Sequence, residues 1–240
     1  ANLLAMKSIL EKARFLLVFG PLLAAQVLTA QFPVAGYFVD EVEIPDSTTT
    51  SIEEQLGETG VKCWRVYLCM ADPYWELQSI YGGEQFNWTL ESESKIFQAQ
   101  ASGGALSSSI NPLLFQFVPE AEFDSWFTIG MDDNSSKCNS ISGMIDPFHL
   151  FEQGEGFVVD DIIAASIFGT WLPPHSQGVA DADGRVLIGQ FTSAGDIKGT
   201  FNFQFRRLEE DLSIERPIES EQVTGFEIEI SKSGGLKKCR

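Results

Sequence analysis

The chain has 240 residues, of which 44% are hydrophobic and 12% aromatic, enough for one large packed β domain or two smaller ones. This composition excludes a disordered chain. The formal charge of −18, from 34 acidic and 16 basic residues, excludes nonspecific nucleic-acid binding through phosphate contacts. Because the acidic residues are spread along the chain, a solvated acidic surface is favoured over a dedicated calcium- or mineral-binding one.

Residues 1–30 have the layout of a signal peptide. Met6 is followed by three basic residues and then by the apolar run FLLVFGPLLAAQVLTA, which ends in small residues. The run holds 16 residues, fewer than the about 20 of a membrane-spanning helix. We therefore expect cleavage near Ala30 and a protein that is secreted or on the cell surface. The alternative is a retained anchor over residues 15–30, which would then be the chain's membrane contact.

A polar N-terminal segment is expected next, over residues 31–60. Its threonine-rich stretch IPDSTTTSIEEQLGETG (residues 44–60) predicts a loop or an irregular edge. Residues 61–207 carry the strand patterns and form the predicted β-sandwich domain. Within it, VKCWRVYLCM and WELQSIYGG lie on either side of a turn at Asp72 and Pro73, which predicts two adjacent strands.

The stretch RVLIGQFTSAGDIKGTFNFQFR shows the clearest strand pattern of the chain. Residues 185–192 are apolar without strict alternation, which is typical of a strand covered on both sides. Residues 197–206 alternate between apolar and polar types, as a half-buried strand does. Residues 193–196 supply a short turn with a glycine, so we predict a hairpin of two neighbouring strands. The side chains expected to face the core are Ile197, Phe201, Phe203 and Phe205.

Residues 208–240 form a tail that is acidic at first and basic at its end, and its VTGFEIEIS segment predicts one last strand. Many short strands separated by turn residues argue against a parallel sheet. The predicted fold class is therefore all-β: an antiparallel β-sandwich or jelly roll with few short helices.

Four cysteines agree with export, because an even number in an oxidising compartment permits two disulfides in any of three connectivities. Cys63 and Cys69 lie on one predicted strand, roughly 20 Å apart, whereas the Cα atoms of a disulfide are about 4.4 to 6.8 Å apart. We expect each to pair elsewhere, with Cys138 as the natural partner of one and Cys239 of the other. The alternative is that some are free buried thiols. No spacing resembles a zinc site.

Four ordered motifs, CWRVYLCMADP, SINPLLFQF, FDSWFTIG and DGRVLIGQFTSAGDIKGTFNFQF, span residues 63–206. Together they resemble an uncharacterised, secreted β-rich domain of surface and extracellular proteins in marine bacteria and unicellular algae. The resemblance implies an exported module, often part of a larger surface or adhesive protein. It assigns no activity, cofactor or site residue.

Two acidic loops are candidates for a calcium site. The DADG loop places Asp181 and Asp183 before a glycine, like the opening of a calcium loop, but the twelfth position from Asp181 is Thr192 where an EF-hand needs a glutamate. An acidic turn is therefore preferred there. A site shared in space with Asp132 and Asp133 of the MDDNSS loop is the alternative, with calcium as the one cofactor considered.

Two N-x-S/T triplets, at Asn87 and Asn134, are candidates for N-glycosylation in a eukaryotic secretory route. Such triplets also arise by chance. The sequence therefore leaves two alternatives at each position, a glycan or an unmodified surface asparagine.

Catalysis is not suggested by the sequence, and we assign no catalytic residue. Glu227 and Glu229 alternate onto one strand face, as the carboxylates of a glycoside hydrolase can, but solvated strand carboxylates are preferred. A serine-hydrolase elbow is missing from the sequence, and the two histidines available as bases are His149 and His175. An enzyme remains an alternative, because triads assemble in space.

The sequence therefore predicts a secreted structural or adhesive module whose partners are other surface or matrix proteins, a second copy of the chain, or polysaccharide. The main alternative is a lectin-like, carbohydrate-binding module assisted by calcium. An exposed line of tryptophans would favour that alternative, because indole rings stack on sugars. The tryptophans considered for this role are Trp75, Trp88, Trp126 and Trp171.

Overall fold

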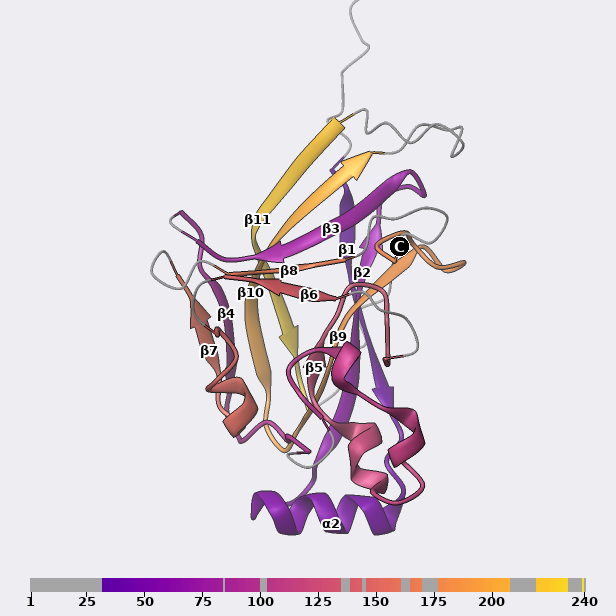
Figure 1. Cartoon of the computed structure of the whole chain (residues 1–240), viewed down its shortest axis with the longest axis vertical. Helices are drawn as coiled ribbons and strands as arrows, with labels where there is room; N and C mark the ends of the chain where they lie inside the picture. The colour runs from indigo at the N-terminus through magenta and orange to yellow at the C-terminus, as the bar shows by residue number, and fades with distance from the viewer. Residues whose placement is uncertain are drawn as a thin grey trace, which may run out of the picture. The chain divides into compact units, whose positions relative to one another are not determined.

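Two antiparallel β-sheets enclose the main core (Figure 1). The computed structural model describes residues 32–83, 85–99, 103–134, 139–143, 146–160, 165–169, 177–207, 219–232 and 239. Strands account for 46% of it and helices for 15%. The predicted all-β sandwich is confirmed.

Each sheet combines strands that are distant in the sequence. The first sheet has the order β1-β2-β9-β5, with β1 (Val34–Val42), β2 (Lys62–Met70), β9 (Arg185–Ser193) and β5 (Trp126–Phe127). The second has the order β6-β8-β3-β10-β4-β7, with β11 also paired to β10. Its strands are β6 (Ser140–Ser142), β8 (Ser166–Phe168), β3 (Trp75–Tyr81), β10 (Ile197–Arg207), β4 (Trp88–Ser92), β7 (Phe157–Val159) and β11 (Glu219–Ile230).

The segments on either side of residues 61–207 join the same sandwich. β1, from the segment expected to be polar, pairs with β2 and buries Tyr37 and Val39. β11 confirms the strand predicted in the tail and pairs with β10 over its length. Tyr37 connects the two sheets at this edge, because its hydroxyl donates to the Glu229 carbonyl at 3.2 Å and accepts from the Glu229 N–H at 3.0 Å.

A helix replaces the loop expected over residues 44–60. α2 (Asp46–Leu56) buries Ile52 and Thr48, which lie four residues apart on one helical face. It ends where Gly57 takes a left-handed conformation (φ 71°) and donates its N–H to the Glu53 carbonyl. The loop expectation was wrong because threonine has low helix propensity, and here packing of one face outweighs it. Short 3₁₀ helices complete the described helices: η1 (Ser107–Ser109), η2 (Pro112–Leu114), η3 (Pro119–Phe123) and η4 (Phe151–Gln153).

The predicted hairpin between β9 and β10 is wrong, although both strands exist. β9 pairs with β2 and β5, whereas β10 pairs with β3, β4 and β11. Residues 194–196 therefore carry the chain from one sheet to the other. β2 and β3 are likewise in different sheets and do not pair as expected. Strand pattern and turn residues are the same for a hairpin and for such a crossing, so they do not distinguish the two.

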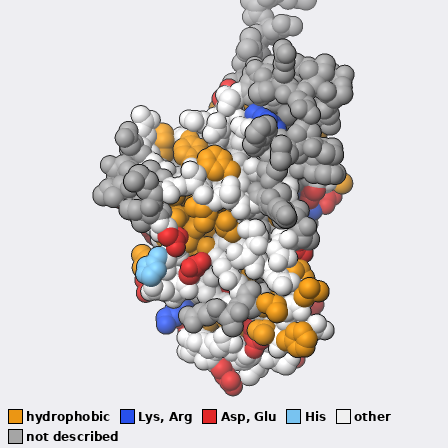
Figure 2. All heavy atoms as spheres, in the orientation of Figure 1, with side chains coloured by type: hydrophobic (Ala, Val, Ile, Leu, Met, Phe, Trp, Pro, Cys, Tyr) orange, Lys and Arg blue, Asp and Glu red, His pale blue; other side chains and the backbone are white. Residues whose placement is uncertain are grey.

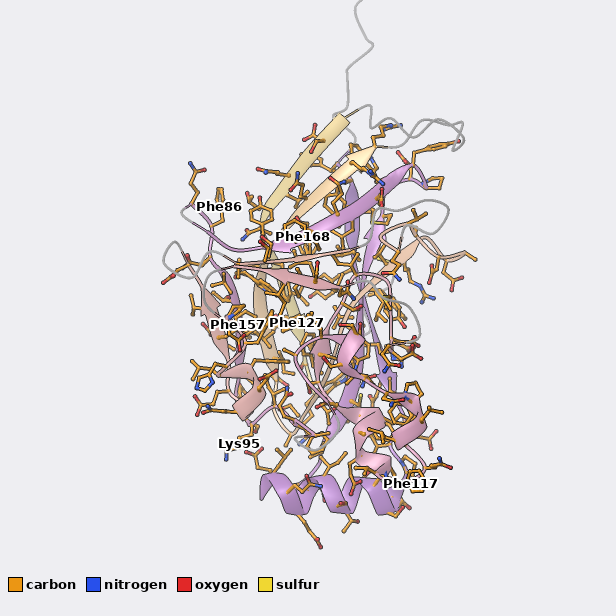
Figure 3. The ribbon with its side chains drawn as sticks, viewed as in Figure 1. Phe86, Lys95, Phe117, Phe127, Phe157 and Phe168 are labelled. Carbon is orange, nitrogen blue, oxygen red and sulfur yellow. A yellow bond between two sulfur atoms is a disulfide. The ribbon has the colours of Figure 1, made fainter. Side chains whose placement is uncertain are left out.

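The main core is aromatic and lies between the sheets. The side chains that the alternation of β10 placed in the core are all buried. Phe127 lies at the centre, with its ring centroid 5.5 Å from that of Phe157 and 5.1 Å from that of Trp88 (Figure 3). β9 is buried on both faces, as its composition predicted.

A second, smaller core lies under α2. It consists of Ile52, Val61, Cys63, Phe97, Ala99, Ala121, Phe123 and Ala194.

One polar residue of β10 departs from the alternation. Asn202 belongs to the face expected to be solvated but is fully buried. Its amide nitrogen donates to the carbonyls of Tyr81, Phe86 and Asn87, and its side-chain oxygen accepts from the Gly225 N–H. The side chain therefore ties together the β3–β4 turn and β11.

One disulfide connects the end of β2 to the C-terminal tail. Cys69 and Cys239 are bonded, with a Cα separation of 5.4 Å. Cys63 is a free, buried thiol whose pKa is raised to about 12 by burial, so it is unreactive at neutral pH. Cys63 and Cys69 do not pair with each other, as expected. Cys138 lies outside the described residues.

The predicted signal peptide also lies outside the described residues. None of the helices in the described part of the chain has the length and apolar character needed to cross a membrane.

Candidate functional site

The tryptophans that the structure describes do not form an exposed platform. Trp64, Trp75, Trp88 and Trp126 are between 0% and 3% exposed, and Trp171 lies outside the described residues. The four buried rings serve the cores, so they are not available to stack on a sugar.

The two acidic loops border one hollow, where their carboxylates pair with arginines. Asp132 lies 3.6 Å from Arg65, and both Asp181 and Asp183 pair with Arg185. A hollow of about 250 Å³ is lined by both arginines together with Asp132 and Asp181. Asp133 is half-buried beside Asp132.

These arginines count against calcium. The described residues contain no group of three or more His, Cys, Asp or Glu side chains placed to hold a metal ion. Calcium binding at Asp132, Asp133, Asp181 and Asp183 stays a prediction, and a cation there would compete with both guanidinium groups.

Both candidate glycosylation asparagines are exposed. Asn87 lies in the β3–β4 turn, between exposed Phe86 and buried Trp88. Asn134 belongs to the MDDNSS loop and donates its N–H to the Ile110 carbonyl at 2.9 Å. Their exposure permits a glycan, and glycosylation stays a prediction.

The carboxylates considered for catalysis line a hollow of about 390 Å³ together with Glu91 and Lys198. Glu227 and Glu229 are exposed on β11, where Lys198 of β10 lies opposite Glu229 with 3.8 Å between their charged atoms. His149 is far along the chain, next to η4, and its ring accepts from the Gln153 amide at 2.9 Å. His175 lies outside the described residues. Both carboxylates are exposed to solvent, and the preference for solvated strand carboxylates stays a prediction.

Asp124 is a buried acid that the sequence reading missed. Its carboxyl is fully buried, and Oδ1 accepts from the Ala99 N–H at 2.7 Å. Gly103 packs so closely on the carboxyl that a Cβ there would lie 1.5 Å from Oδ2. Burial raises the pKa of Asp124 to about 7. Hydrogen bonds from backbone N–H groups oppose this shift, and the nearby Glu152 charge adds to it. The carboxyl is thus packed between Ala99 and Gly103, which points to a structural role.

Residues 112–119 form a surface that we call the apolar loop. Leu113 and Phe117 are 73% and 75% exposed. Phe115 and Val118, from the same loop, pack against the second core and fasten the loop to the domain. Figure 2 shows a cluster of apolar side chains at the lower right, where Figure 3 labels Phe117.

The apolar loop is ordered by its own hydrogen bonds. The Asn111 side chain accepts from the Leu113 N–H at 3.1 Å, and the Leu114 carbonyl accepts from the N–H groups of Phe117 and Val118, each at 2.8 Å. The residues of the INPLLFQF run are mostly apolar, and the sequence does not indicate that half of them face solvent.

The largest hollow described lies beside α2, and we call it the glutamine groove. Its rim carries Gln55 of α2, Gln98 and Gln153, together with Lys95 and Glu120, and its volume is about 510 Å³. No sequence signal identified it, because its lining residues are contributed by four separate segments.

Comparison of the chain with protein-family models, with curated proteins and with solved structures found no match. The resemblance to an exported surface domain therefore stays a prediction.

Proposed function

We propose that this protein is an exported structural or adhesive module that binds other surface or matrix proteins through its apolar loop. The observation that supports this is the exposure of Leu113 and Phe117 on a hydrogen-bonded loop anchored in the second core. Large apolar side chains held in solvent at one place are typical of protein-binding surfaces, and bulky anchors of this kind carry most of the energy of an interface.

Charge defines the chemistry of the partner. The sequence has no Lys or Arg between Lys95 and Lys137, and Glu120 and Glu122 follow the apolar loop directly. The partner surface would therefore be an apolar pocket with lysines or arginines at its rim, because opposite charges steer and orient association. A second copy of a chain with charge −18 would bring like charges together, so a different protein is favoured over self-association.

The four buried tryptophans support this function over a lectin that stacks sugars on indole rings. An ordered loop with exposed anchors is positioned for contact and has no reacting groups. Export, expected from residues 1–30, would place it on a surface or in a matrix.

The test compares three forms of the full chain, secreted by an oxidising host and immobilised. The wild type is exposed to a protein fraction from the cell surface and matrix of the source organism, beside Leu113→Ser/Phe117→Ser and a matched control, Phe86→Ser/Phe168→Ser, which removes two exposed aromatic rings elsewhere. The captured protein is identified, purified and measured again alone.

We expect the apolar-loop variant to lose at least about tenfold in affinity, as when anchors are removed, and the control to bind like the wild type. Added salt should weaken binding, because the rim is charged. Equal binding by wild type and apolar-loop variant would overturn the proposal, and so would equal loss in both variants, since that indicates nonspecific apolar adsorption.

A further inference from the structure

The glutamine groove is a surface hollow beside α2. It lies between the C-terminal turn of α2, the extended segment 95–99, the start of η3 and the end of η4. Figure 3 labels Lys95 above one end of α2 and Phe117 at the other. The groove volume of about 510 Å³ falls within the range of about 300–1,000 Å³ that small-molecule sites have. It can therefore take a ligand of two or three sugar rings.

Three amides on the rim are oriented by the protein through their nitrogens. The Gln98 amide donates to the Ser125 carbonyl at 3.3 Å, and the Gln153 amide donates to the His149 ring at 2.9 Å. The Gln55 amide approaches the Ser51 hydroxyl at 3.4 Å. Each amide oxygen is left as an acceptor. Hydroxyl groups are the donors that such a set of acceptors fits.

The lining of the groove has one positive side chain, Lys95, and one negative, Glu120, and the Glu58 carboxylate beside it accepts from the Lys95 backbone N–H at 3.4 Å. Lys95 has no carboxylate within 4.0 Å of its ammonium group in the described part of the chain, so its three N–H donors are available. Glu120 on the opposite side accepts from the Ser51 hydroxyl, which lowers the pKa of Glu120 and keeps it ionised. One positive and one negative group favour a neutral ligand over a polyanion or a polycation.

The floor of the groove is apolar. Leu56 and Val118 line it, are half-buried and pack against the second core, and Phe97 of that core lines it as well. Polar groups at the rim over an apolar floor match the C–H faces and the hydroxyl edges of a sugar ring.

We propose that the glutamine groove binds a neutral oligosaccharide of two or three rings. This site shares Val118 with the apolar loop but neither of its exposed anchors, Leu113 and Phe117, and the proposal goes beyond the proposed function. With both sites occupied, the module would connect a matrix protein to a neutral polysaccharide.

The test titrates the full chain, secreted by an oxidising host, with defined saccharides and follows binding by calorimetry and NMR. The probes are neutral trisaccharides with β1,3, β1,4 and α1,4 linkages, a tri-uronic acid of matched size, and an uncharged tripeptide. The variants are Gln55→Ala/Gln153→Ala, both at exposed positions, and the matched control Gln222→Ala, an exposed glutamine on β11.

We expect at least one neutral trisaccharide to bind, to shift the resonances of Lys95 and Gln98, and to bind about tenfold more weakly to the double variant, since two hydrogen bonds are lost. Gln222→Ala should bind like the wild type. The proposal is overturned if no neutral trisaccharide binds, if the double variant binds as the wild type does, or if the uronic acid or the peptide binds more tightly.

Leu113→Ser/Phe117→Ser separates this proposal from the proposed function. It should retain saccharide binding, because neither side chain lines the groove. A protein that binds saccharide but no matrix protein would refute only the proposed function, and the reverse result would refute only the groove.

Discussion

The two cores of the molecule differ in their side chains and in the elements that pack around them. The main core lies between two sheets and is filled with large aromatic rings around Phe127. The second core under α2 includes a cysteine and three alanines, and the buried Asp124 lies at its border with Ala99. Both proposed binding surfaces border the second core. Stability is thus concentrated where the rings pack, and recognition is placed on loops and short helices that a smaller core supports.

Removing a ring from the main core should have the largest effect on stability. We expect Phe127→Ala to lower the free energy of unfolding by about 3–5 kcal/mol, because a cavity forms among rings that cannot close it. Chemical denaturation measures the change. The control is Phe117→Ala on the apolar loop, expected to stay within about 0.5 kcal/mol of the wild type. Similar losses for the two variants would contradict the division between core and recognition surface.

Asp124 should make the border of the second core sensitive to pH. Its pKa is raised from 3.8 to about 7 in the folded state, so the folded protein binds a proton more tightly than the unfolded chain. Stability contributed by the protonated acid is present below about pH 4 and is lost as pH rises to about 7.

The substitution Asp124→Asn should remove this loss of stability with rising pH. The difference in free energy of unfolding between variant and wild type should shift in favour of the variant from pH 4 to pH 8. We expect this shift to be at most about 4 kcal/mol, since each pKa unit is worth about 1.4 kcal/mol. Denaturation curves at pH 5 and pH 8 provide the comparison. A difference between the two proteins that is the same at both pH values would show that Asp124 does not titrate in this range.

The smallest effect is expected inside the second core. Ile52→Val removes one methylene group from a fully buried side chain of α2 and should cost about 0.5–1.5 kcal/mol. Thermal denaturation and the two binding assays are measured on the same sample. A loss of unfolding free energy as large as that of Phe127→Ala would show that the second core contributes as much to stability as the main core. A loss of saccharide binding in a folded variant would show that the second core contributes directly to binding.

Local patterns predicted the strands well. The alternation along residues 197–206 identified the buried phenylalanines of β10, and the aliphatic run before it identified β9 as covered on both faces, because side-chain direction in a strand depends only on residue spacing. The last strand was found in the tail for the same reason. Asn202 broke the alternation because its three carbonyl acceptors come from another turn of the chain.

The helix and the candidate sites could not be predicted in this way. α2 depends on what covers Ile52, and the pKa of Asp124 is raised because the fold buries its carboxyl. The apolar loop and the glutamine groove are surfaces, and a sequence does not state which apolar residues remain uncovered.

Residue order alone therefore established the all-β class, the positions of β9, β10 and β11, and the separation of Cys63 from Cys69. Tertiary structure decided that β9 and β10 lie in different sheets, that Cys69 pairs with Cys239, and that four tryptophans are buried. The physical reason is the range of the interactions. Alternation acts between neighbours along the chain, whereas sheet partners, disulfides and exposed surfaces depend on residues that only the fold brings together.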